Sequence, residues 1–280
     1  MKRSGMTLVE LLVVLAILAL LTTVAVTSSD VVLSQGRYEA TKRTLTDIQE
    51  AVLGPPNARQ ADGTLISTGF VADMGRSPLC TSPDTTVGLS ELWLLPSGIA
   101  PFSLIQSAND TDVVVPCGWR GPYLRLAVGQ TSVRDGWGNP LNLSGDLAGD
   151  PAAVGNPILV VSSTGGASSP YNAPLLANIA PAQIIISGNV YVLDSNGNPT
   201  NPTNTVQVWM YGPNPSTGLL WEYQCTQTTA TDGVVSYSLP AGVYAPGYLR
   251  AYLGSSRAAA TQKSPIVQFQ RSGVVNLNIH

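Results

Sequence analysis

Glu10 is the residue of this chain whose type and setting point most directly to chemistry. It is the only ionisable side chain in residues 6–26, which otherwise hold apolar residues and threonines. A carboxylate in such a run costs up to about 3 kcal/mol near a bilayer centre, which favours a functional role. If the chain were cut after Gly5, the new amine of Met6 would lie one helical turn from Glu10 and could neutralise it, within one chain or between neighbours. The alternative is that Glu10 reaches the nearby headgroups.

The other reactive side chains do not form an enzyme signature. The single histidine is His280, which argues against His-based triads and metal sites. The sequence has no GxSxG, phosphate-loop, HExxH or CxxC pattern. Asp194, Asn196 and Asn198 have the spacing that begins a calcium loop, but no glutamate follows at the bidentate position, which favours a solvated turn. We therefore expect no catalytic residues, no cofactor and no small-molecule substrate.

The composition narrows the class of protein further. Charged residues make up 11% of the 280, against about 25% in typical domains. With 27 glycines and 21 prolines, the chain is predicted to consist largely of strands and loops. The net charge is −3, and Lys42-Arg43 is the only pair of adjacent basic residues after the N-terminus. Nucleic acid is therefore not an expected partner.

The elements that would position Glu10 are an apolar segment and its helical continuation. Residues 6–26 would span about 30 Å as a helix, the thickness of one hydrocarbon core. Lys2 and Arg3 precede this predicted transmembrane segment, so the N-terminus is expected to stay cytoplasmic. Helical spacing continues to residue 53 and stops at Gly54, which two prolines follow. The apolar stripe of this continuation is Val32, Tyr38, Leu45, Ile48 and Val52.

The basic leader ending in Gly5, the apolar run and Glu10 together resemble the N-terminus of type IV pilins and pseudopilins. The resemblance implies that residues 1–5 are a prepilin leader, that prepilin peptidase cuts between Gly5 and Met6, and that the amine of Met6 is then methylated. It also implies that Glu10 pairs with the amine of an adjacent subunit during filament assembly. The family usually has a proline further along, where this chain has Thr27, so the helix is expected to lack the usual kink or melted stretch.

The resemblance also implies a function and a location. The expected function is that of a structural subunit of a pilus-like filament, a pseudopilin of type II secretion or a related system. The expected location is the bacterial inner membrane, with a single pass and the head in the periplasm, and the partners are other pilins or pseudopilins. One alternative is a minor type IV pilin with an adhesive or display domain, in a surface filament. A weaker one is a monomeric membrane protein that never polymerises.

Residues 54–180 are predicted to form a small head of loops and short strands. Two stretches in it, 118–125 (GWRGPYLR) and 135–141 (DGWGNPL), are predicted to be turns with aromatic anchors. They also resemble segments of the major pseudopilin, in which a following loop helps to bind calcium. The matching stretch here, 160–169, has no carboxylate, so the calcium inference does not carry over.

Residues 181–280 change to a strict strand pattern. Seven or eight short alternating runs, with hairpin signals at Asn196-Gly197 and Asp232-Gly233, predict a β-sandwich domain. The pattern resembles carboxypeptidase-regulatory-like or transthyretin-like modules, which implies binding or spacing rather than a reaction. Residues 170–181 are interpreted as a linker before this domain. The expected fold class is therefore α+β: a long N-terminal helix (6–53), a head (54–180) and a sandwich (181–280).

The three cysteines are Cys80, Cys117 and Cys225. A head outside the cytoplasm permits a disulfide, and the predicted pair is Cys80–Cys117 because both lie in the head. Cys225, in a predicted strand, would be left as a buried thiol. Three free, buried cysteines are the alternative.

Overall fold

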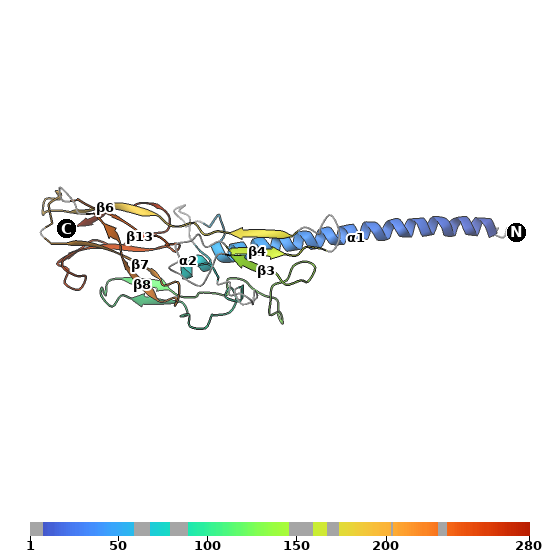
Figure 1. The fold of residues 1–280 in the computed structure, drawn as a ribbon, viewed down its shortest axis with the longest axis horizontal. Helices are drawn as coiled ribbons and strands as arrows, with labels where there is room; N and C mark the ends of the chain where they lie inside the picture. The colour runs from blue at the N-terminus through green and yellow to red at the C-terminus, as the bar shows by residue number, and fades with distance from the viewer. Residues whose placement is uncertain are drawn as a thin grey trace, which may run out of the picture.

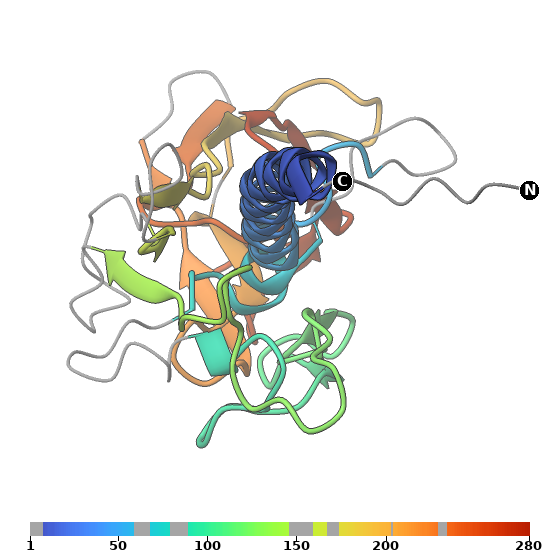
Figure 2. The same cartoon turned by 90° about the vertical axis from the view of Figure 1, so that its right-hand side faces the viewer.

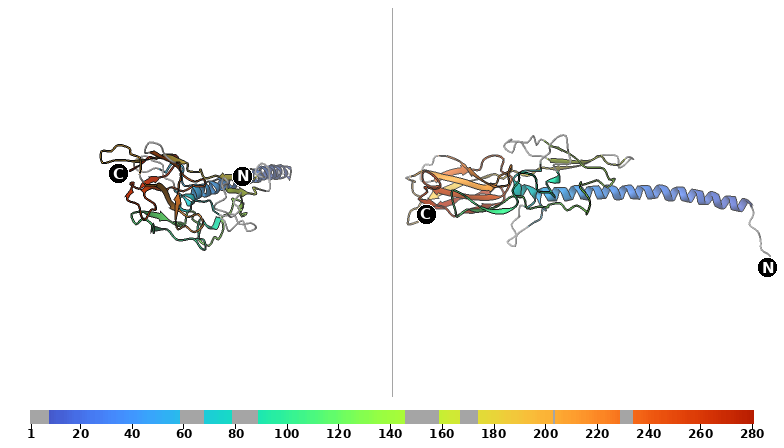
Figure 3. Two further views of the ribbon diagram at one scale, coloured as in Figure 1. Left: turned by 60° about the vertical axis from the view of Figure 1, so that its left-hand side comes forward. Right: turned by 90° about the horizontal axis from the view of Figure 1, so that it is seen from below.

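The computed structural model describes residues 8–58, 68–78, 89–145, 159–166, 174–202, 204–228 and 234–280, with backbone alone at 24–29 and 144–145. The fold is α+β, as predicted. A long helix projects from one end of the molecule, and β-sheets form the other end (Figure 1). The C-terminal sheets lie at the end of the molecule opposite the N-terminus, in line with the helix (Figures 1 and 3).

The helix α1 runs without a break from Leu8 to Leu53. It continues through Thr27, as the missing proline predicts, and ends at Gly54, whose positive φ of 83° suits a helix terminus. All described side chains of residues 8–23 are exposed. Over the described part of the chain, no helix has an apolar stretch of sufficient length to cross a membrane.

The second half of α1 packs on the head. Leu45, Ile48 and Val52 are buried on one stripe, as the spacing predicts. Val32 is 67% exposed and Tyr38 is only partly buried, so the predicted stripe begins later than expected. The reason is that the head covers α1 only from about Arg37 onward. The short helix α2 (Phe70–Met74) is entirely buried and belongs to the same core.

Two small sheets complete the head. The strands β1 (Ser103–Gln106) and β2 (Val114–Cys117) form an antiparallel hairpin. The strands β3 (Asn142–Gly145), β4 (Leu159–Ser163) and β5 (Leu175–Ile179) form an antiparallel sheet that packs on α1. The linker predicted at 170–181 is wrong in part, because β5 lies within it. The sequence of β5, Leu-Leu-Ala-Asn-Ile, has a weak strand pattern. The burial of Ile179 in the core stabilises the strand.

Two facing sheets form the C-terminal part, consistent with the predicted β-sandwich. One has the order β14-β6-β10-β9, with β15 also paired to β6; the other has the order β12-β11-β7-β8, with β13 also paired to β11. The strands of the first are β6 (Ile186–Val192), β9 (Thr226–Gln227), β10 (Val234–Ser238), β14 (Gly273–Val274) and β15 (Leu277–Ile279). Those of the second are β7 (Val206–Pro213), β8 (Leu220–Gln224), β11 (Gly247–Leu253), β12 (Gln262–Lys263) and β13 (Val267–Phe269).

The buried hydrophobic residues in the described part of the chain fall into three clusters, and one of them crosses the predicted domain boundary. The first lies between the two C-terminal sheets, and the second joins α1, α2 and the β3–β5 sheet. The third joins Val113, Val115 and Cys117 of the head to Tyr211 and Tyr252 of the C-terminal sheet. The hairpin β1–β2 is thus a third layer on the outer face of that sheet. The boundary at residue 181 stays a prediction, but the two parts share a core.

Candidate functional site: the apolar half of α1 and the loops that anchor the helix

The first half of α1 is an unpartnered apolar surface. Leu8, Leu12, Leu15 and Leu20 are 58–79% exposed, and all side chains between them except Glu10 are apolar. Figure 2 views the helix nearly end-on, and Figure 1 shows its N-terminal part projecting away from the sheets. An apolar helix surface of this size is normally covered by lipid or by other protein. We therefore expect this segment to be covered by lipid or by other protein chains.

Glu10 lies in the first turn of α1 and is exposed. A carboxylate near a helix N-terminus is favoured by the partial positive charge of the free backbone N–H groups. Gly5 and Met6, the predicted cleavage and methylation residues, lie outside the described part of the chain. The described residues therefore place one member of the predicted pair, and the pairing stays a prediction.

One comparison bears directly on this end of the chain. Residues 1–26 match the family model of the prokaryotic N-terminal methylation motif. This motif is the signature of type IV pilins and pseudopilins, and it contains Gly5, Met6 and Glu10. No curated protein matches the chain significantly. The resemblance stated for residues 1–26 is confirmed, while the head and the C-terminal part have no such support from relatives.

The DGWGNP loop docks the head on the helix that carries the methylation motif. The hydroxyl of Thr41, on a buried turn of α1, accepts a hydrogen bond from the backbone N–H of Gly136 at 2.9 Å. Gly136 lies so close to α1 that a Cβ there would overlap the carbonyl of Arg37. The buried carboxylate of Asp135 accepts hydrogen bonds from the N–H groups of Trp137 and Asn139, which shapes the loop. The predicted turn thus attaches the head to α1, which we call the stalk.

The GWRGPYLR stretch is also a turn anchored by aromatic side chains, as predicted. The indole N–H of Trp119 donates to the carbonyl of Glu91 at 2.7 Å. The hydroxyl of Tyr123 donates to the carboxylate of Asp73 at 2.9 Å, and Arg120 forms an ion pair with the same carboxylate at 2.8 Å. Burial raises the pKa of Asp73 despite the charge of Arg120 and the hydrogen bond from Tyr123. This turn ties α2 to the rest of the head.

The described residues of the serine-rich loop do not fit a calcium site. The hydroxyl of Ser163 donates to Asp135, whose carboxylate already accepts bonds from Trp137 and Asn139. A carboxylate occupied by N–H and O–H donors has no lone pairs left over for a cation. Among described residues, no group of three or more His, Cys, Asp or Glu side chains is placed to hold a metal ion.

The Asp194 turn has the geometry of a structural turn. Its carboxylate accepts hydrogen bonds from the backbone N–H groups of Asn196 and Asn198, both at 2.8 Å. These bonds lower the pKa of Asp194. They also explain the spacing of the three residues, because an aspartate caps such a turn through its own side chain. This is the solvated turn that the sequence favours.

Cys117 and Cys225 are buried, and neither is bonded to another cysteine among the described residues. Burial raises the pKa of each thiol to about 12. Cys80 lies outside the described residues, so its predicted disulfide with Cys117 is not seen and stays a prediction. The alternative of three free cysteines also stays open.

Sequence reasoning missed the polar cluster around Asp110. This residue, in the turn between β1 and β2, has a fully buried side chain and ion pairs with Arg250 and Lys263. The only local signal is the pair of aspartates in Ser-Ala-Asn-Asp-Thr-Asp, residues 107–112, which looks like a solvated loop. Its partners lie about 140 residues away in the sequence, beyond the reach of any pattern.

Proposed function

We propose that this chain is a structural subunit of a pilus-like filament. In this proposal prepilin peptidase removes residues 1–5, Met6 becomes the methylated N-terminus, and the apolar half of α1 lies first in the inner membrane and then in the filament interior. The observation that carries the proposal is the methylation motif at residues 1–26, placed on a helix whose first half exposes mainly apolar side chains. The head and the C-terminal sheets then lie outside the membrane.

The physical basis is the free energy that it costs to leave the apolar first half of α1 exposed to water. Leu8, Leu12 and Leu20 alone expose side chains whose burial would each contribute about 1.5–3 kcal/mol. A bundle of such helices from several subunits would remove this surface from water. The second half of α1 stays attached to its own head, so assembly can use the first half without unfolding the rest.

The finer assignment to type II secretion has some support in the head. The GPYL and WGNP turns, which resemble segments of the major pseudopilin, occur in the expected order. The first is hydrogen-bonded to α2 and the second to α1. The stretch that corresponds to the calcium-binding loop of the major pseudopilin, residues 160–169, has no carboxylate. A pseudopilin of type II secretion or of a related system is the function we favour.

A minor type IV pilin with a display domain is the second candidate. The observation that favours it is the place of the C-terminal sheets, at the end of the molecule farthest from the N-terminus (Figure 1). A module there would be presented outward from a filament. Electron microscopy of sheared surface filaments, probed with antibody to residues 181–280, separates the two. Labelled surface fibres support the minor pilin, and label confined to the cell envelope supports the pseudopilin.

Processing is the direct test of the proposed function. Mass analysis of the membrane-extracted chain should find Met6 as the N-terminal residue, carrying one methyl group. Gly5→Val should block the cut, because the bulky side chain changes the residue just before the scissile bond. Gly36→Val is the matched control, since Gly36 lies on the exposed stalk far from the cut and should leave processing unchanged. Retention of Met1 in the natural chain would refute the proposal.

A further inference from the structure

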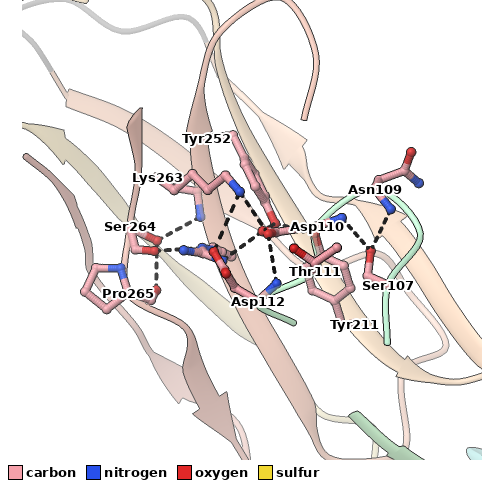
Figure 4. Close-up of polar contacts among 12 residues, drawn as sticks. Ser107, Asn109, Asp110, Thr111, Asp112, Tyr211, Tyr252, Lys263, Ser264 and Pro265 are labelled. Carbon is pink, nitrogen blue, oxygen red and sulfur yellow. Dashed lines mark hydrogen bonds and ion pairs between the residues drawn. The ribbon is translucent and has the colours of Figure 1, made fainter. Parts of the chain in front are cut away.

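The turn between β1 and β2, residues 107–112, lies across the outer face of the C-terminal sheet. We call it the acidic turn (Figure 4). Its Asp110 has a side chain with no exposed surface, and the carboxylate has partners on two strands. It accepts a hydrogen bond from Tyr252 at 2.6 Å and forms ion pairs with Arg250 at 2.8 Å and Lys263 at 2.9 Å. The strands β11 and β12 therefore hold this end of the turn.

The other end of the acidic turn is bound to β8. The side chains of Ser107 and Asn109 both donate to the carboxylate of Glu222. Glu222 is in turn paired with Arg257, whose guanidinium lies 3.7 Å from the centre of the Trp209 ring. The turn is thus held at both ends.

Two tyrosines connect these anchors. The hydroxyls of Tyr211 and Tyr252 are hydrogen-bonded to each other, and Tyr252 donates to Asp110. The charge of Arg257 also acts on the Tyr211 hydroxyl. Both rings are fully buried and pack with Val113, Val115 and Cys117 of the hairpin. The polar network therefore crosses the contact between the head and the C-terminal sheet, with an apolar cluster around it.

The charges in the network favour the docked position. Burial alone would raise the pKa of Asp110, but the hydrogen bonds from Tyr252 and Lys263 and the charges of Arg250 and Lys263 outweigh it, and the pKa lies below its ordinary value. The remaining charged group beside it is Asp112, 60% exposed and also paired with Arg250. A lowered pKa means that Asp110 stabilises the docked state at neutral pH and loses this effect only in acid, as pH falls below the ordinary pKa of 3.8.

A separate contact joins the two parts beside the acidic turn. Arg76 of the head forms a buried, bidentate ion pair with Glu91 and donates from Nε to the carbonyl of Pro215 at 2.7 Å. Pro215 lies in the connection between β7 and β8 of the C-terminal sheet. The head therefore holds that sheet at two places, with charged groups that have little exposed surface in each.

From this geometry we infer that the acidic turn is a latch, which fixes the C-terminal sandwich to the head so that sandwich and stalk form one rigid body. The outer face of the β12-β11-β7-β8 sheet is the surface that receives it. A load or a bound partner on the sandwich would then act on α1 through the hairpin, rather than through a flexible tether. The inference does not rest on the proposed filament function, because the network is internal to one chain.

Hydrogen–deuterium exchange of the full chain in detergent tests the latch. Asp110→Asn removes the buried charge that Arg250 and Lys263 share and leaves the exposed Asp112 as their carboxylate partner in this cluster. We expect exchange of the amides of β1, β2 and β12 to rise at least about tenfold. Exchange in β4 and β5 should not change, because they belong to a different core. Asp47→Asn, the same chemical change at an exposed position of α1, is the matched control and should leave all of these rates unchanged.

A second variant covers the case in which Asp110→Asn disturbs folding. Lys263→Gln removes one partner of Asp110 at a side chain that is 31% exposed, so the chain keeps Arg250 and Tyr252 as partners. The latch predicts a smaller rise confined to the same strands. Unchanged exchange in the hairpin for both variants would overturn the inference. A rise of equal size in β4 and β5 would overturn it as well, because it would indicate general loss of stability rather than release of one contact.

Discussion

Glu10 is the only ionisable side chain in residues 6–26, and its effect on assembly depends on the group that packs beside it. When the apolar half of α1 is buried among other helices, an unpaired carboxylate there costs several kcal/mol. The amine of a cleaved Met6 would offset this cost only in the correct register. Pairing would therefore select the axial position of a subunit rather than add much net stability.

We predict that Glu10→Leu is inserted and cleaved normally but enters filaments at least about tenfold less well, because the amine of Met6 then lacks a partner. Quantitative immunoblotting of isolated filaments, with the variant as sole copy, measures this. Glu10→Asp keeps the charge and should retain part of the assembly. Normal assembly of the leucine variant would rule out the pairing role.

The cysteines allow a second test at the scale of residues. A thiol pKa of about 12 instead of the ordinary 9.0 lowers the thiolate fraction at pH 8 about a thousandfold. Cys117 and Cys225 should therefore react very slowly with iodoacetamide in the native chain and rapidly in denaturant. Mass analysis after denaturation also counts thiols. Three alkyl groups mean that all cysteines are free, and one means that Cys80 and Cys117 are bridged.

At the scale of elements, the DGWGNP loop and the second half of α1 depend on close backbone contact. Gly136→Ala places a methyl group against the carbonyl of Arg37, which the helix hydrogen bonds hold in place. We expect a loss of about 1–3 kcal/mol in the free energy of unfolding, as for other overpacked sites. Urea unfolding followed by tryptophan fluorescence would measure it.

Gly36→Ala is the control for this prediction. Gly36 lies inside α1, and a Cβ there meets no atom within 4 Å. Alanine is favoured over glycine by about 1 kcal/mol in a helix interior, so this variant should not lose stability. If both variants unfold at the same urea concentration, the loop does not dock on α1 as described.

At the scale of the whole molecule, the third core cluster changes what is expected of the C-terminal sandwich alone. A fragment of residues 181–280 would expose the buried faces of Tyr211 and Tyr252 and leave Arg250 without Asp110. We predict that it unfolds at a lower urea concentration than a chain that lacks only residues 1–28. That longer chain should be soluble and mostly β, since it keeps the strands and lacks the apolar run of residues 6–26. Equal stability of the two would show that the hairpin contributes little.

Local patterns predicted much of the fold and of the candidate site. The Gly5–Met6–Glu10 arrangement, the uninterrupted helix to residue 53, its end at Gly54 and the C-terminal strands all rest on signals within a few residues of each other. Glycines, prolines and an alternating or helical period act on the backbone nearby, so the sequence shows them directly.

The tertiary structure decided the rest, because the responsible contacts join residues far apart in the chain. The pattern of residues 170–181 indicates a linker, since only the packing of β5 against α1 and β4 makes it a strand. The strands β14 and β15 pair with β6 in parallel, and no local turn sequence predicts this pairing. Above all, Asp110 looks like a solvated loop residue until folding brings Arg250, Tyr252 and Lys263 around it. Burial and charge pairing at that distance exist only in the folded chain.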